Sequence, residues 1–188
     1  MDDLHRRAFF GDTLRRALNA VSDFVPAEAR PVKHLRLLRP PGAIGPERFS
    51  DTCRRCGECV RACPASAIFP LETSISRLAG TPNIDPAKAA CVLCEGLKCT
   101  HVCPSGALQA LTESSMVRMG LAKVSTTRCV RTIGDPCDEC VVRCPLGARA
   151  IRLAGAGPPE IVVPGCTGCG VCELYCPTSP KAVIIRPL

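Results

Sequence analysis

The sixteen cysteines of this 188-residue chain form four groups of four, and each group ends in Cys-Pro. In every group three cysteines lie close together and the fourth follows after three intervening residues. The groups are Cys53, Cys56, Cys59 and Cys63; Cys91, Cys94, Cys99 and Cys103; Cys129, Cys137, Cys140 and Cys144; and Cys166, Cys169, Cys172 and Cys176. With no tryptophan and one tyrosine in the chain, we expect the cysteines to hold the fold together, as disulfides or as metal ligands.

The first and fourth groups have the spacing C-x2-C-x2-C-x3-C-P, which is typical of iron–sulfur cluster binding. Three thiolates on one short loop can bind three irons of a [4Fe–4S] cluster, and the fourth cysteine, next to a proline that favours a helix start, is directed to a second cluster. Thiolates are the soft ligands that such clusters require. We therefore expect all sixteen cysteines to be iron ligands of four [4Fe–4S] clusters. Because no group lacks a ligand, the pattern predicts no open catalytic iron, and we expect no catalytic residue.

Two other uses of cysteine fit the pattern less well. Disulfide frameworks are typical of small secreted domains, and structural zinc sites usually join two C-x2-C pairs across a long gap. Here each group is a compact triplet with a fourth cysteine close behind it, which favours clusters over both.

The formal net charge of +7 would by itself suggest nucleic-acid binding. That count treats every cysteine as neutral, whereas clusters with four thiolate ligands carry negative charge, and four of them would offset the whole excess. A surface for single-stranded nucleic acid also needs aromatic side chains beside its basic groups, and aromatic residues make up only 3% of the chain. We expect no nucleic acid among the partners.

The compartment is predicted from the N-terminal residues. No segment approaches the roughly 20 apolar residues of a transmembrane helix, so we expect no stable membrane span. Arg6-Arg7 superficially resembles a twin-arginine export signal. Asp12, Arg15 and Arg16 then interrupt the apolar stretch that such a signal needs. We therefore predict a cytoplasmic protein, with the periplasm as the alternative.

Residues 1–25 are predicted to form an amphipathic helix that Pro26 ends. The apolar residues that share one face of this helix are Phe10, Leu14, Ala17, Val21 and Phe24. This face could pack on the chain's own core, bind a partner subunit or a second copy of the chain, or lie on a membrane surface. Residues 26–48 contain five prolines and two glycines, which predicts a Pro-rich extended linker, bound along a surface or mobile.

Residues 49–188 form an internal repeat. After each Cys-Pro a short turn or helix of small residues precedes an apolar stretch, and two more apolar stretches precede the later groups. The predicted strands are 67–69, 107–111, 121–124, 150–153, 161–163 and 182–185. The unit is that of half a bacterial ferredoxin. The predicted fold class is therefore α+β, with two bacterial-ferredoxin-like two-cluster domains of short strands and helices after the N-terminal helix and the linker.

Four further features make the cysteine pattern specific. They are Arg39-Pro40-Pro41-Gly42-Ala43, Cys-Pro-Ser-Gly-Ala-Leu at 103–108, the long third group ending in Cys137-Asp138-Glu139-Cys140, and Cys166-Thr167-Gly168-Cys169-Gly170. With these features the chain resembles the ferredoxin-type subunits of the periplasmic nitrate reductase and methylamine-utilisation systems. It is also similar in size and cluster count to the small polyferredoxin-like subunit of bacterial tungsten-dependent aldehyde oxidoreductases.

The resemblance to four-cluster subunits of oxidoreductases implies a nested pairing of the groups, first with fourth and second with third, with sequential pairing as the alternative. Each cluster then takes three cysteines from one group and the fourth from the paired group. The implied ligand sets are Cys53, Cys56 and Cys59 with Cys176; Cys166, Cys169 and Cys172 with Cys63; Cys91, Cys94 and Cys99 with Cys144; and Cys129, Cys137 and Cys140 with Cys103.

The resemblance also implies a function. We expect a non-catalytic electron-transfer subunit that relays single electrons between a catalytic oxidoreductase subunit and other redox partners. The favoured catalytic subunit is a tungsten- or molybdenum-cofactor aldehyde oxidoreductase. The alternative is a ferredoxin-like assembly or maturation factor for a metalloenzyme, and a third hypothesis is that residues 1–25 join copies of the chain.

The positive charges of Arg54, Arg55 and Arg61 predict a higher reduction potential for the cluster built on the first triplet.

Overall fold

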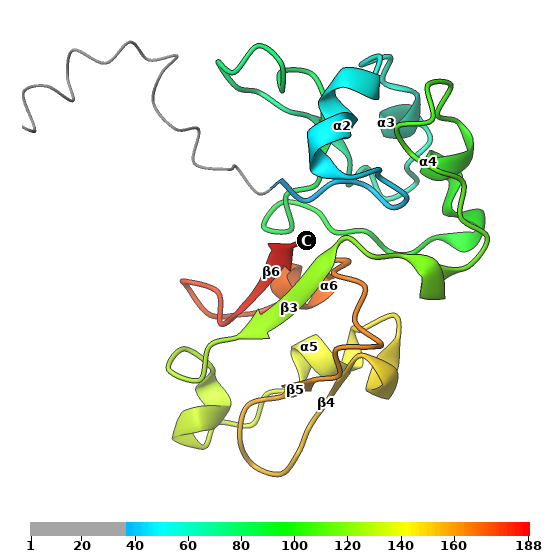
Figure 1. Ribbon diagram of the computed structural model, residues 1–188. Helices are drawn as coiled ribbons and strands as arrows, with labels where there is room; N and C mark the ends of the chain where they lie inside the picture. The colour runs from blue at the N-terminus through cyan, green and yellow to red at the C-terminus, as the bar shows by residue number, and fades with distance from the viewer. Residues whose placement is uncertain (1–36) are drawn as a thin grey trace, which may run out of the picture. The chain divides into compact units, whose positions relative to one another are not determined.

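The computed structural model describes residues 37–188 (Figure 1). The predicted helix over 1–25, its predicted contact with a second copy and the first part of the predicted linker lie outside the described residues. The described residues form one compact unit. In this part of the chain the longest helix has seven residues and the longest strands have five, so the expected mixture of short helices and strands is confirmed.

The elements have the following bounds. The helices are α2 (Pro46–Thr52), α3 (Glu58–Arg61), α4 (Lys98–His101), α5 (Glu139–Val142) and α6 (Val171–Leu174). The 3-10 turns are η2 (Glu95–Leu97), η3 (Ser114–Met116), η4 (Val130–Ile133) and η5 (Gly147–Arg149). The strands are β1 (Phe69–Pro70), β2 (Pro82–Asn83), β3 (Gly120–Val124), β4 (Ile151–Arg152), β5 (Glu160–Ile161) and β6 (Val183–Pro187).

The internal repeat appears in helices α3 to α6, because each carries the third cysteine of one group. These cysteines are Cys59, Cys99, Cys140 and Cys172. Each helix makes about one turn and ends before the next Cys-Pro, since the residue before a proline disfavours the helical conformation. The third and fourth cysteines of every group are therefore separated by the same kind of local turn.

The strands form three two-stranded antiparallel sheets, β1 with β2, β3 with β6 and β4 with β5. Five of the predicted strands overlap these elements. The prediction of a strand over 107–111 is wrong, because this segment makes only an isolated bridge between Leu108 and Ala43. Its neighbour is the Pro40-Pro41-Gly42 segment, and prolines have no N–H to continue a ladder.

The longest sheet joins segments that are far apart in the chain. Strand β3 pairs with β6 from Gly120↔Pro187 to Val124↔Val183, and the two strands lie side by side in Figure 1. The loop of the fourth cysteine group packs on the start of β3. A Cβ on Gly168 would lie 2.4 Å from the backbone nitrogen of Gly120, and the φ of Gly168 is +73°, so only glycine fits there.

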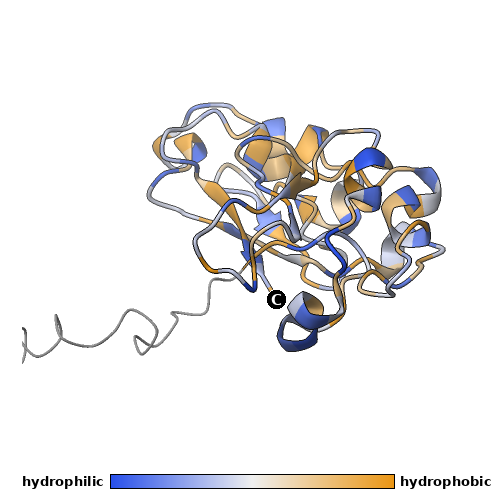
Figure 2. Ribbon diagram, turned by 90° about the horizontal axis from the view of Figure 1, so that it is seen from above, coloured by the Kyte–Doolittle hydropathy of each residue, from blue (hydrophilic) through white to orange (hydrophobic). Residues whose placement is uncertain are grey.

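Two hydrophobic cores stabilise the unit, and cysteines belong to both. The first contains Phe49, Leu97 and Val117 together with cysteines of the first two groups. The second contains Ile151 and Val183 together with cysteines of the last two groups. Figure 2 shows apolar residues spread over many short segments. Since none of the described elements is long enough to offer a continuous apolar face, the cysteine loops themselves complete the cores.

The packed body begins earlier than the predicted boundary at residue 49. Leu38 is 4% exposed, and Pro40 and Pro41 are fully buried. The N–H of Ile44 donates to the carbonyl oxygen of Ala107 over 3.1 Å. Residues 37–48, which composition places in a linker, therefore supply part of the first core.

Candidate metal centres

All sixteen cysteines lie within the described residues as free thiols, and they line four pockets. Each pocket takes three cysteines from one group and the fourth cysteine from another. Site 1 is lined by Cys53, Cys56, Cys59 and Cys103; site 2 by Cys91, Cys94, Cys99 and Cys63; site 3 by Cys129, Cys137, Cys140 and Cys176; and site 4 by Cys166, Cys169, Cys172 and Cys144. The expected arrangement of three cysteines plus one is present in every site.

These pockets contradict the nested pairing of first with fourth group and second with third. Sites 1 and 2 exchange Cys103 and Cys63, so the first group pairs with the second. Sites 3 and 4 exchange Cys176 and Cys144, so the third pairs with the fourth. The physical reason is connectivity: α3 packs on α4 and α5 on α6, because consecutive short elements usually lie side by side. The sequential alternative describes the structure.

The pockets fit a group that is larger than one ion. Among residues 37–188, no three His, Cys, Asp or Glu side chains converge closely enough to hold a single metal ion, whereas all the thiolates of a zinc site lie about 2.3 Å from the metal. In a [4Fe–4S] cluster each thiolate binds a different iron, so the four sulfurs stand farther apart around a shared centre. The donor set of each site therefore fits a [4Fe–4S] cluster.

Backbone N–H groups donate to the fourth cysteines of three groups. The bonds run from Ala67 to Cys63 Sγ (3.4 Å), from Leu108 to Cys103 Sγ (3.4 Å) and from Ala182 to Cys176 Sγ (3.3 Å). Such bonds stabilise negative charge on sulfur and so bear on the reduction potential. We did not predict these donors from the sequence, although all three lie in the apolar stretches that follow Cys-Pro.

Burial keeps several of these thiols neutral when no metal is bound. It raises the pKa to about 11 for Cys59 and Cys140 and to about 12 for Cys91 and Cys99. Neighbouring thiolates act in the same direction, as Cys53 does on the pKa of Cys59. Because iron binds the thiolate, loading these sites must release protons.

Cys103 shows the opposite balance. Burial disfavours its ionisation, but the N–H of Leu108 and the hydroxyl of Ser105 outweigh burial and lower the pKa of its thiol. The thiol of Cys103 therefore ionises more readily than that of Cys59, whose pKa is raised.

Contacts between neighbouring sites give their order. Helix α3 of site 1 packs on α4 of site 2, the N–H of Cys91 in site 2 donates to the carbonyl oxygen of Cys169 in site 4, and α6 of site 4 packs on α5 of site 3. The pKa shifts of the thiols agree with this order. A charge on one member raises the pKa of the other in the pairs Cys59 and Cys99 (sites 1 and 2), Cys169 and Cys91 (sites 4 and 2) and Cys140 and Cys172 (sites 3 and 4). The sites follow one another in space as 1, 2, 4 and 3. The third and fourth groups are thus reversed relative to their order along the chain.

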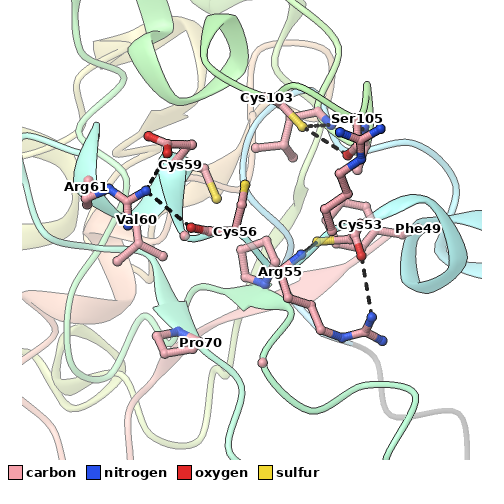
Figure 3. Close-up of a pocket in the computed structure, with 17 residues that line it drawn as sticks. Phe49, Cys53, Arg55, Cys56, Cys59, Val60, Arg61, Pro70, Cys103 and Ser105 are labelled. Carbon is pink, nitrogen blue, oxygen red and sulfur yellow. Dashed lines mark hydrogen bonds and ion pairs between the residues drawn. The ribbon is translucent and has the colours of Figure 1, made fainter.

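Site 1 has the largest cavity of the four, and Figure 3 shows the residues that line it. Its cavity has a volume of about 180 Å³, against about 20 Å³ for each of the other three sites, and Cys56 is exposed. Arg54, Arg55 and Arg61 line it, as the sequence suggested. Arg61 also forms an ion pair with Glu58.

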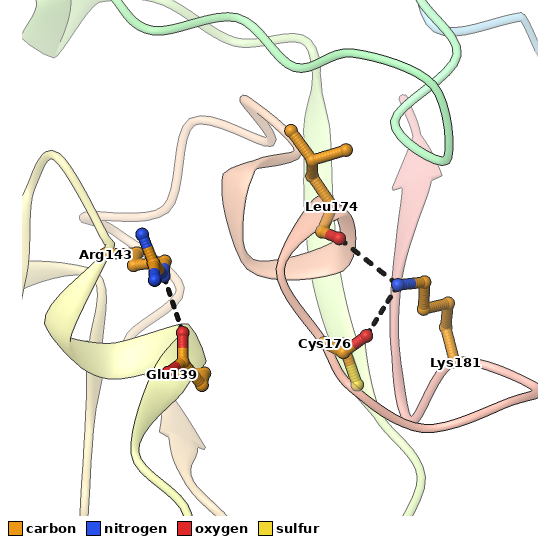
Figure 4. Close-up of polar contacts among 5 residues, drawn as sticks. All are labelled: Glu139, Arg143, Leu174, Cys176 and Lys181. Carbon is orange, nitrogen blue, oxygen red and sulfur yellow. Dashed lines mark hydrogen bonds and ion pairs between the residues drawn. The ribbon is translucent and has the colours of Figure 1, made fainter.

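A lysine supports the loop that carries the fourth cysteine of site 3 (Figure 4). The Nζ of Lys181 donates to the carbonyl oxygens of Cys176, over 2.5 Å, and of Leu174, over 3.1 Å. Figure 4 also shows the ion pair of Arg143 with Glu139, over 2.5 Å. The Lys181 cation therefore holds the backbone at Cys176, while the N–H of Ala182 donates to its Sγ.

Comparisons with known proteins agree with this chemistry. The model of the 4Fe-4S dicluster domain family matches residues 52–107, which contain the first two groups. The chain is 38% identical over 198 residues to the ferredoxin-type protein NapG of Escherichia coli (strain K12), covering 97% of this chain and 86% of that protein. It is 34% identical over 169 residues to the methylamine utilization ferredoxin-type protein MauM of Methylophilus methylotrophus, covering 85% and 75% of the two chains.

One structural similarity is too low to say anything about the fold. A chain of the formate dehydrogenase–heterodisulfide reductase–formylmethanofuran dehydrogenase complex from Methanospirillum hungatei aligns with a TM-score of 0.27 and 21% identity, over 74% of this chain and 51% of that one. Within the described part of the chain, no helix has the length and apolar character needed to cross a membrane.

Proposed function

The chain belongs to the family of NapG and MauM ferredoxin-type proteins, and from this we propose a non-catalytic electron-transfer subunit with one [4Fe–4S] cluster in each of sites 1 to 4. The observation that carries the proposal is the gathering of all sixteen cysteines into four pockets of three plus one. A bound cluster supplies one-electron chemistry. The chain's own residues supply the thiolates, the N–H donors to sulfur and the apolar surroundings that limit access of water.

The order of the sites makes sites 1 and 3 the two ends of the series. Site 1 has the larger cavity and an exposed cysteine, Cys56. Exchange of electrons with another protein needs a site near the surface. We therefore propose that a redox partner binds at the mouth of site 1.

The partner that we propose is a catalytic oxidoreductase subunit. The tungsten- or molybdenum-cofactor aldehyde oxidoreductase stays our named candidate from the sequence, and a second copy of the chain bound through residues 1–25 stays a prediction. For the compartment, the cytoplasmic prediction has no support from the relatives. The periplasmic alternative fits better, because the chain resembles ferredoxin-type proteins of the periplasmic nitrate reductase and methylamine-utilisation systems.

The test is anaerobic purification followed by chemical analysis and EPR spectroscopy. We expect about sixteen irons and as many sulfides per chain, as four [4Fe–4S] clusters require, and co-purification in fixed stoichiometry with a catalytic subunit. Fewer than four clusters in the intact protein would overturn the cofactor assignment. Transient binding to a metal-free enzyme alone would instead support the assembly-factor alternative.

A further inference from the structure

Arg39 places a positive charge beside site 1 from a segment that has no cysteine. Its Nη1 donates to the Thr81 hydroxyl over 2.8 Å and to the Pro82 carbonyl oxygen over 2.7 Å. The guanidinium carbon lies 4.6 Å from the centre of the Phe49 ring. Phe49 and Pro82 also line site 1, so the guanidinium lies directly behind the wall of that pocket.

Among residues 37–188 no carboxylate forms an ion pair with Arg39. The ion pairs found among residues 37–188 involve other side chains, and the partners of Arg39 are a hydroxyl, a carbonyl and an aromatic face. Burial lowers the pKa of Arg39 to about 10, while the negative charge of Cys53 acts in the opposite direction. A half-buried cation needs a compensating anion. Glu58, the carboxylate that lines site 1, is paired with Arg61, so the thiolates of site 1 are the negative groups left to compensate Arg39.

We propose that Arg39 compensates the negative charge of the cluster in site 1 and raises its reduction potential. The inference rests on the proposed function, because it needs a cluster at that site. A nearby positive charge stabilises the reduced, more negative state by Coulomb attraction. A half-buried charge is screened less by water and salt than an exposed one, so Arg39 has a larger effect than an exposed arginine at similar range.

The residues that follow Arg39 keep it in this position. Pro40 and Pro41 are fully buried, and their rings fix the backbone φ. The φ of Gly42 is +75°, and a Cβ there would lie 2.2 Å from the carbonyl oxygen of Gln109, so only glycine fits. Ligation of the clusters does not explain the Arg39-Pro40-Pro41-Gly42 motif. Its prolines and glycine serve to hold the guanidinium of Arg39 in place.

Arg55 offers a matched control. Its backbone N–H donates to Cys53 Sγ over 3.4 Å, so it is close to the same ligand. Its side chain is exposed and donates to the carbonyl oxygens of Ala79 and Arg77 over 3.0 and 2.7 Å. Arg55→Gln removes the same unit of charge as Arg39→Gln, but from a position that solvent screens.

The experiment is potentiometric EPR of the intact four-cluster protein. The site 1 signal is identified as the one that Cys56→Ser alters. In Arg39→Gln we expect this signal to shift to a lower midpoint potential while the other three stay in place. Arg55→Gln is expected to give a smaller shift that disappears at high salt, whereas the Arg39→Gln shift persists. Equal shifts in both variants, or no shift in Arg39→Gln, would overturn the proposal.

Arg39→Lys separates charge from hydrogen bonding. Lysine keeps the charge but loses the planar fork of donors, so we expect a midpoint close to that of the unchanged protein. If Arg39→Gln fails to assemble site 1, the Arg39→Lys variant decides alone. A retained midpoint potential in Arg39→Lys supports charge compensation, and a lost or displaced signal shows that Arg39 is only structural. Four intact clusters with unaltered potentials in Arg39→Gln would refute this inference and leave the proposed function standing. An iron count below four clusters in the unchanged protein would refute the function itself.

Discussion

The backbone N–H of Cys91 donates a hydrogen bond to the carbonyl oxygen of Cys169 over 2.9 Å. Cys91 lines site 2 and Cys169 lines site 4, so this bond joins the half of the body that holds the first two groups to the half that holds the last two. Cys169 also packs in the first hydrophobic core, whereas Cys166 and Cys172 of its group pack in the second. The two middle sites are therefore held together by the main chain and by a shared core.

The pairing of the groups predicts which substitutions affect the same cluster. Cys103→Ser and Cys53→Ser are expected to alter one and the same EPR signal, because both residues line site 1. Cys144→Ser and Cys166→Ser are likewise expected to alter one common signal, that of site 4. The measurement is EPR of the reduced protein under anaerobic conditions. Nested pairing predicts instead that Cys103→Ser matches Cys129→Ser.

The contact between the loop of the fourth cysteine group and β3 predicts that adding one methyl group at Gly168 lowers the stability of the protein strongly. Gly168→Ala adds a left-handed backbone strain of about 1–2 kcal/mol and an overlap with Gly120 that costs about 1–3 kcal/mol. Thermal bleaching of the cluster absorbance should occur at a clearly lower temperature. Gly96→Ala is the control, since its φ is +71° and a Cβ there meets open space. Equal losses in the two variants would show that the β3 contact contributes nothing.

The raised thiol pKa values predict that cluster assembly depends on pH. Burial raises the pKa of Cys91 from 9.0 to about 12, so its thiol is protonated near neutral pH and must lose that proton to bind iron. Reconstitution of the metal-free protein with iron and sulfide should proceed further at about pH 9 than at about pH 7 and should release protons. Cluster absorbance and proton counting at constant pH measure both effects. An extent of reconstitution that is the same at both pH values contradicts the prediction.

The same shift has the opposite effect on the metal-free fold. A raised pKa favours the folded state as long as the thiol is protonated. This contribution is fully present below pH 9.0 and is lost as the pH rises toward about 12. Denaturant titrations of the metal-free protein should therefore show falling stability across that range, and stability that rises there would be inconsistent with burial of the neutral thiol.

The openness of site 1 predicts the order in which clusters are lost. Cys56 of site 1 is exposed, whereas three cysteines of site 4, Cys166, Cys169 and Cys172, are buried. Treatment with an oxidant and an iron chelator should remove the site 1 signal first and the site 4 signal last, as followed by EPR at successive times. If the site 4 signal disappears first, burial of the ligands does not govern access to the clusters.

The local part of this architecture is readable in the sequence. The spacing within each group determines that Cys59, Cys99, Cys140 and Cys172 sit on equivalent one-turn helices, because loop length and the following proline act over only a few residues. Strands β3 and β6 are likewise marked by their apolar residues. The strand predicted at 107–111 was wrong because its partner, the Pro40–Gly42 segment, cannot form a ladder and lies about 65 residues away in the chain.

By itself the sequence determined the donor set, sixteen thiols in four groups of three plus one, and with it the kind of cofactor that these residues can hold. Only the tertiary structure decided which fourth cysteine completes each site, that sites 4 and 3 are reversed along the series, and that Arg39 lies behind the wall of site 1. The ligand spacing is a property of a few consecutive residues. Pairing and charge compensation depend on which distant segments pack together, and that choice is made by the cores and by main-chain bonds such as the one between Cys91 and Cys169.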